Sequence, residues 1–162
     1  MRLKVGYPKP RVHPPDWDGC WRVYTVCETS DPASCTTRRD ISALGSELDE
    51  SNARKSCVSL INKAHTGRPF SDLYDKTQCH PIHEYAHTTS TGQTELHKIW
   101  RIWGTGKTRL CFLYVPGRRI VLLSILAKRK NKLDDGEVSE LESSAKAVLQ
   151  CLERSNFEDK VI

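Results

Sequence analysis

Residues 96–132 read LHKIWRIWGTGKTRLCFLYVPGRRIVLLSILAKRKNK, and this stretch decides the fold. Strand-forming residues fill three runs, which lie at 97–103, 108–115 and 119–127. The turn-forming sequences GTGK (104–107) and VPGR (115–118) separate these runs. We therefore predict an antiparallel meander, in which the almost wholly apolar third run is a central strand covered on both faces.

The same stretch is strongly basic, with ten Lys or Arg residues and no Asp or Glu. The 162-residue chain has a formal net charge of +5, so the other 125 residues, with 15 basic and 20 acidic side chains, carry −5. Trp100, Trp103, Phe112 and Tyr114 interleave with the cations. Charge runs are commonly solvated faces, but rings that stack on bases beside cations that neutralise phosphates, with no carboxylate in the stretch, favour nucleic-acid binding.

Upstream of the meander the pattern predicts one strand and two helices. Residues 20–27 (CWRVYTVC) alternate apolar and polar groups as a strand does. Apolar positions within 37–65 recur at helical spacing, with a break at 45–51, and thus predict a helical hairpin. Asp49 or Ser51 would cap the second helix. Residues 70–95 are irregular and rich in His, Thr, Ser and Gly, so we predict a loop there.

Downstream, residues 137–154 have one apolar stripe at helical spacing and acidic residues in the first turn, which predicts a helix packed on the sheet or on a partner. The length suits one domain, 17–162, preceded by a basic, proline-rich arm at 1–16 that is extended or caps a strand. We expect a cytoplasmic protein, because no apolar run could span a bilayer and no signal segment is present. Seven cysteines at irregular spacing are expected to be reduced.

Two motifs suggest other chemistry. The sequence Gly104-Thr-Gly-Lys-Thr108 resembles the end of a P-loop, but Arg101 stands where the first glycine is required and no helix follows. His83-Glu-Tyr-Ala-His87 matches the zinc motif H-E-x-x-H, although the sequence around it does not predict the long helix that the motif needs. A zinc-containing domain that uses His83, Glu84 and His87 therefore stays an alternative.

Three short motifs link the basic stretch to a known family. They are Lys98-Ile99, Arg109-Leu110 followed by Tyr114, and the basic tip Lys128-Arg129-Lys130. With the order strand, helical hairpin, three-stranded meander and closing helix, they resemble the RelE/ParE toxin superfamily. The motifs cover residues 96 to about 152, and the N-terminal half is similar only in its architecture.

The resemblance implies a RelE-like α+β fold, in which a small antiparallel sheet, made of an N-terminal strand and the meander, packs with a helical hairpin and a C-terminal helix. RelE-type members are small cytosolic ribonucleases that cut messenger RNA, commonly in the ribosomal A site, and a cognate antitoxin neutralises them. The ParE branch poisons DNA gyrase instead. We therefore expect an RNA-cleaving toxin, or alternatively a non-catalytic toxin or regulator that binds a protein such as gyrase, or nucleic acid.

The RelE-type reaction is the attack of a ribose 2′-hydroxyl on the adjacent phosphate, and the resemblance implies no metal or cofactor. It implies that Arg109 clamps the phosphate, that Arg129 stabilises the transition state or assists the leaving group, and that Lys98 takes the proton, provided these groups converge. The family's catalytic tyrosine has no counterpart at 131–142, so His97 or Trp100 would substitute. The complete expected site comprises catalytic Lys98, Arg109, Lys128 and Arg129, and RNA-binding His97, Trp100, Arg101, Lys107, Tyr114 and Lys130.

Overall fold

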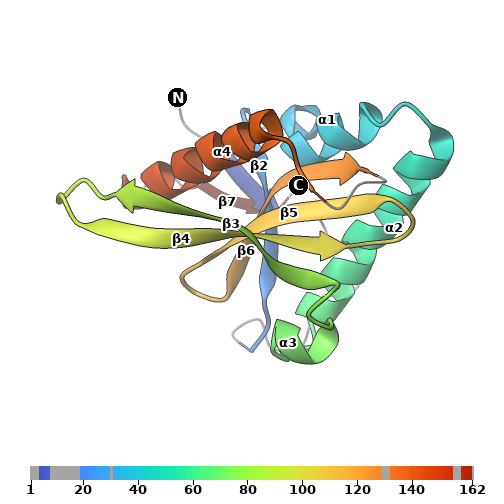
Figure 1. Cartoon of the computed structure of the whole chain (residues 1–162), viewed down its shortest axis with the longest axis horizontal. Coiled ribbons are helices and arrows are strands. Elements are labelled where there is room, and N and C mark those ends of the chain that lie inside the picture. The colour runs from blue at the N-terminus through green and yellow to red at the C-terminus, as the bar shows by residue number, and fades with distance from the viewer. Residues whose placement is uncertain (1–3, 8–18, 30, 129–131, 155–157, 162) are drawn as a thin grey trace.

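The computed structural model describes residues 4–7, 19–29, 31–128, 132–154 and 158–161, and they form an α+β fold (Figure 1). The strands are β1 (Lys4–Tyr7), β2 (Arg22–Cys27), β3 (Cys79–Thr88), β4 (Thr94–Trp103), β5 (Thr108–Val115), β6 (Arg119–Ala127) and β7 (Glu158–Val161). The helices are α1 (Thr36–Ser42), α2 (Glu47–Ala64), α3 (Phe70–Leu73) and α4 (Asp135–Glu153), with a short 3-10 turn at Pro32–Ser34.

All seven strands belong to one sheet, in the order β3-β4-β5-β6-β2-β1-β7. The predicted meander is confirmed, because β4, β5 and β6 pair antiparallel in sequence. The sheet is mixed and larger than the small antiparallel sheet that we expected, since β2 runs parallel to β6 and β1 parallel to β7. Residues 4–7 of the predicted arm are the strand β1, and residues 8–18 lie outside the described part.

The predicted loop at 70–95 is wrong. It contains α3 and the ten-residue strand β3, which pairs with β4 from Cys79 to Thr88. The sequence pattern did not predict β3 because the strand is polar and contains a proline. Pro81 is tolerated because β3 is the edge of the sheet and the pairing is irregular between Pro81 and His83. The β3–β4 hairpin projects well beyond the rest of the sheet (Figure 1).

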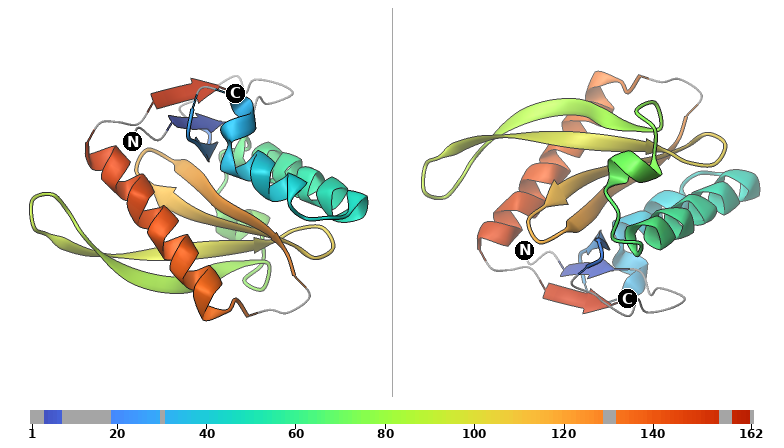
Figure 2. Two further views of the ribbon diagram at one scale, coloured as in Figure 1. Left: turned by 90° about the horizontal axis from the view of Figure 1, so that it is seen from above. Right: turned by 90° about the horizontal axis from the view of Figure 1, so that it is seen from below.

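Helices cover both faces of the sheet (Figure 2). On one face, Ile99, Cys111 and Leu113 of the sheet pack against α4. On the other face, Leu110 and Phe112 pack against α2 and α3. Side chains of β5 and β6 are buried along most of both strands, which confirms the expected central position of the third run.

Turn chemistry fixes the β5–β6 hairpin. Gly117 has φ 85° and Arg118 has φ 55°, so two successive residues adopt the left-handed conformation in the tight connection between β5 and β6. Arg118 is not glycine, but its guanidinium donates to the Gly19 carbonyl at 2.7 Å and thereby ties the turn to the approach of β2. A hydrogen bond of a charged donor offsets part of the backbone strain.

Side-chain caps define where α2 and α4 begin. Ser46, rather than Asp49 or Ser51 as we predicted, caps α2 and accepts from the Asp49 amide at 3.1 Å. The helix begins earlier because the chain turns at Gly45, which has φ 78°. Asp134 caps α4 and forms a capping box with Glu137.

Replacement of Asp134 by alanine is expected to lower the free energy of unfolding by about 1 kcal/mol, because the Glu137 amide loses its acceptor. Asp134→Ser keeps an oxygen at the cap and is expected to stay within about 0.5 kcal/mol of the parent chain. Urea denaturation measures both values. Equal stability of the two variants would contradict a stabilising role of the cap.

All seven cysteines are free thiols, as the sequence predicts. Cys111 is fully buried in the core beneath α4, and burial raises the pKa of its thiol to about 12. Such a thiol stays protonated and acts as a small apolar side chain. In the described ranges, none of the helices is both long enough and apolar enough to cross a membrane.

Candidate nucleic-acid interface

A hollow of about 950 Å³ opens between the edge of the sheet and the start of α4. The basic side chains Lys76, Arg101 and Lys132 line it, and Asp135 is the one acidic side chain among its described lining residues. Two imidazoles and an indole complete the functional groups of the wall, from His80, His83 and Trp103. The hollow therefore presents cations, proton carriers and a flat ring to one space.

Arg101 and His80 are register partners on β4 and β3, and their side chains are in contact. Arg101 is only 5% exposed, and its Nη2 donates to Nε2 of His80 at 3.1 Å. Because a guanidinium only donates, Nε2 of His80 accepts and the neutral ring carries its proton on Nδ1. Nδ1 is buried and has no hydrogen-bond partner among the described residues, so His80 holds an unused donor beside the hollow.

Arg109 lies behind this wall and is only 2% exposed. Its guanidinium stacks on Trp103 at 4.0 Å from the ring centroid, and Nη1 donates to the Thr108 carbonyl at 3.0 Å. Its Nε has no hydrogen-bond partner within the described part of the chain. Burial, and then the charge of Arg101, lower the pKa of Arg109 from its ordinary value. Two neighbouring buried guanidinium charges favour an anion in the adjoining space.

His83 lines the same hollow and is held from behind by α4. Its Nε2 lies 2.7 Å from Oε2 of Glu142, and Nζ of Lys146 donates to Oε1 of the same carboxylate at 2.5 Å. Hydrogen bonds from Lys146 and then from His83 lower the pKa of Glu142, so the carboxylate is ionised. An ionised carboxylate fixes the orientation and tautomer of a histidine ring.

The H-E-x-x-H motif does not converge as a zinc site. It lies on β3 rather than on a helix, so His83 and His87 share the face toward α4 while Glu84 points to the opposite face. Each histidine bonds a glutamate of α4, and Glu84 approaches Lys98 at 3.9 Å. Among the described residues, no group of three or more His, Cys, Asp or Glu side chains is placed to hold a metal ion.

The sheet separates the residues expected to form one catalytic site. Strand alternation puts His97, Arg101 and Arg109 on the face that packs against α4. Lys98 lies on the other face, so Lys98 and Arg109 do not converge and the expected proton transfer by Lys98 lacks its geometric condition. Lys107 lies in the β4–β5 turn, and Arg129 and Lys130 lie outside the described residues.

Carboxylates from other segments compensate two of the cations, contrary to the expectation from the basic stretch alone. Lys128 pairs with Glu137 at the start of α4, and Lys98 faces Glu84. The stretch itself contains no Asp or Glu. Strand pairing brings Glu84 close to it, and helix packing brings Glu137 close to it. Lys98 and Lys128 therefore add less to the positive potential of the sheet than the basic stretch alone suggests.

The aromatic side chains expected as a base-stacking platform are mostly core. Tyr114 lies 5.3 Å from Trp100, 5.1 Å from Phe112 and 5.4 Å from Trp21, measured between ring centroids. These rings form one cluster on the α2 face, and Phe112 is fully buried. Trp103 is the ring that lines the hollow, which makes it the better stacking residue.

Sequence reasoning missed much of the hollow because its wall comes from the segment predicted as a loop. Lys76, His80 and His83 all belong to that segment, and Lys132 follows the basic tip. The period-two spacing of His83, Tyr85 and His87 was the available signal for a strand with one histidine-rich face.

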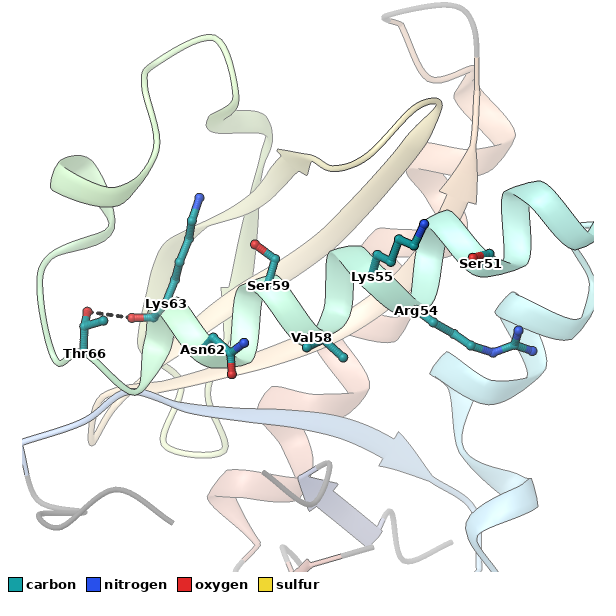
Figure 3. A pocket seen from close by; sticks show the side chains of 8 residues that line it. All are labelled: Ser51, Arg54, Lys55, Val58, Ser59, Asn62, Lys63 and Thr66. Carbon is teal, nitrogen blue, oxygen red and sulfur yellow. Dashed lines mark hydrogen bonds between the residues drawn. The ribbon is translucent and has the colours of Figure 1, made fainter. Parts of the chain in front are cut away.

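A second hollow of about 610 Å³ runs along the outer side of α2 (Figure 3). The side chains of Lys55, Ser59 and Lys63 point to one side of the helix, and those of Arg54, Val58 and Asn62 point to the other (Figure 3). All its lining residues are exposed or half-buried. This surface has neither converging groups nor a buried charge, so it is not the candidate site.

Comparisons with known proteins assign neither a family nor a function to the chain. No protein-family model matches the chain. No curated protein matches it either, and no solved structure does.

Proposed function

We propose that the basic hollow binds the phosphate backbone of RNA and that the chain is the RNA-cleaving toxin of a toxin–antitoxin pair. The observation that carries the proposal is the buried pair Arg101 and Arg109 beside a hollow lined by further cations. Two guanidinium groups side by side raise the positive potential of the adjoining hollow, which attracts anionic ligands. The resemblance of residues 96–152 to the RelE/ParE superfamily supports the same assignment.

The hollow offers the cations that this chemistry needs. Arg101 lines the hollow and would bind a phosphate oxygen directly, while Arg109 adds positive potential from behind Trp103. Attack of a 2′-hydroxyl places extra negative charge on the phosphorus oxygens, and preorganised cations stabilise that charge in the transition state. The same attack is impossible on DNA, which lacks the 2′-hydroxyl.

The purified chain is expected to cut messenger RNA, either free or on translating ribosomes, and to leave a 2′,3′-cyclic phosphate and a 5′-hydroxyl. Arg101→Lys keeps the charge but loses the planar fork, so the cleavage rate is expected to fall about tenfold. Arg54→Lys, at a 61% exposed position on α2, is the matched control and is expected to change the rate less than about twofold. Primer extension and end-group analysis measure the products.

Intact messenger RNA together with altered DNA supercoiling would contradict this proposal and favour the gyrase-directed alternative. Stoichiometric zinc by elemental analysis, with loss of the fold on chelation, would contradict it in favour of the zinc domain. We also expect a short neighbouring reading frame to encode a small DNA-binding antitoxin that neutralises the chain.

A further inference from the structure

We infer that His83 accepts the proton of the attacking 2′-hydroxyl and that Glu142 positions the His83 ring; this inference rests on the RNA cleavage proposed above. It assigns a general base to a site in which Lys98, the base expected from the sequence, lies on the wrong face of the sheet. It also gives a role to a histidine from β3, the strand that the sequence pattern concealed.

The hydrogen bonds around His83 leave Nδ1 without a partner among the described residues. Glu142 is ionised and only accepts, so Nε2 of His83 donates to it across 2.7 Å. In the neutral ring, Nδ1 is then the nitrogen with a lone pair. A carboxylate that holds one nitrogen and stabilises the imidazolium as it forms is the arrangement of a histidine base in hydrolytic triads.

The second imidazole of the hollow is unsuited to this role. Nε2 of His80 already accepts from Arg101, and its Nδ1 carries the proton. His80 thus has no lone pair to offer while it contacts Arg101, although it can donate to a phosphate oxygen. The two rings therefore have different roles: His83 accepts the proton, and His80 donates a hydrogen bond.

The proposed step balances without a metal or redox partner. His83 Nδ1 takes the 2′-hydroxyl proton while the 2′-oxygen forms its bond to phosphorus. The bond from phosphorus to the 5′-oxygen breaks, and the departing oxygen takes a proton from water. The products are a 2′,3′-cyclic phosphate and a 5′-hydroxyl, and the imidazolium returns its proton to solvent.

Several charged groups surround His83 and enter any pH profile. From α4, Glu142 and Lys146 lie behind the ring, and Tyr85 stacks beside it at 6.3 Å between centroids. Across the hollow stand Lys76, His80, Arg101, Lys132 and Asp135. Cations outnumber carboxylates on the open side, and the carboxylate of Glu142 lies on the closed side of the ring.

The strand offers a matched control in His87. Its Nε2 lies 2.7 Å from Glu153, so His87 makes the same kind of contact with α4 as His83 makes with Glu142. His87 differs from His83 because it is only 5% exposed and does not line the hollow. His83→Gln is expected to lower the single-turnover rate of RNA cleavage about 100-fold. His87→Gln is expected to keep the rate within about threefold of the parent chain, since it alters only packing.

Two further measurements separate catalysis from folding. Free imidazole is expected to restore cleavage to His83→Ala but not to Arg101→Lys. Glu142→Gln is expected to move the acid limb of the pH–rate profile to lower pH, because a neutral amide no longer favours the imidazolium. A merely structural contact predicts no rescue and an unmoved acid limb.

The inference is overturned if the parent chain cuts RNA, Arg101→Lys cuts slowly and His83→Gln keeps the parental rate and pH profile. That result leaves the proposed function intact. A parent chain that produces no cyclic phosphate overturns both proposals together.

Discussion

Arg109→Met is expected to yield a folded chain that is at least as stable as the parent and that cuts RNA about tenfold more slowly. The activity should fall because the hollow loses the positive potential of a nearby preorganised cation, which costs less than the loss of a donor in direct contact. The stability should hold because the substitution removes a buried charge, for which the described residues supply no carboxylate contact. Methionine fills the space of the arginine stem without the charge.

The gain in stability is limited by the contacts that are lost. Arg109 gives up its stacking on Trp103 and its bond to the Thr108 carbonyl, which together offset much of the relief from charge burial. We therefore expect a change between zero and a gain of about 2 kcal/mol in the free energy of unfolding. Urea denaturation and a single-turnover cleavage assay on the same preparation measure the two effects.

A loss of more than about 1 kcal/mol would mean that Arg109 has a structural role, and its burial would then no longer argue for an anion site. Arg109→Ala serves as the control for packing, because it removes the charge and leaves a cavity. Its stability is expected to lie below that of Arg109→Met, with an equal loss of cleavage. The comparison separates the charge from the volume of the side chain.

The sequence predicted the meander well because its signals are local. Two glycine-containing turns and three runs of β-branched and aromatic residues specify strands without reference to the rest of the chain. The C-terminal helix was equally predictable, because one apolar stripe at helical spacing indicates it. By contrast, β3 is stabilised by its pairing with β4 and by two histidine–glutamate contacts 59 and 66 residues apart, and no local pattern reports such contacts.

The site was harder to predict than the fold, since it depends on the face of the sheet on which each side chain lies. Arg101 and Arg109 were recognised as candidates, and the structure brings them together. Lys98 and Lys128 were candidates as well, but the rest of the chain supplies a carboxylate to each, Glu84 to Lys98 and Glu137 to Lys128. Charge counted along a segment does not show which cations face a carboxylate from another segment.

Phe112→Ala is expected to lower the free energy of unfolding by about 3–5 kcal/mol, a large share of the stability of a domain of this size. The ring is fully buried on the face that packs against α2 and lies edge-on to Tyr114 at 5.1 Å between centroids. Its removal leaves a cavity between the sheet and the helix, where neighbouring rings cannot collapse into the space. Thermal or urea denaturation measures the loss.

Leu96→Ala is the control for this prediction, because Leu96 is 70% exposed on the projecting hairpin and its truncation should cost less than about 0.5 kcal/mol. The Phe112→Leu variant tests whether the aromatic cluster stabilises the core or stacks on RNA bases. It keeps most of the apolar volume and removes the ring, so we expect a loss of about 1–1.5 kcal/mol and an unchanged rate of RNA cleavage. A folded Phe112→Leu chain that no longer cuts RNA would instead support the base-stacking role of these rings and would move the interface to the α2 face of the sheet.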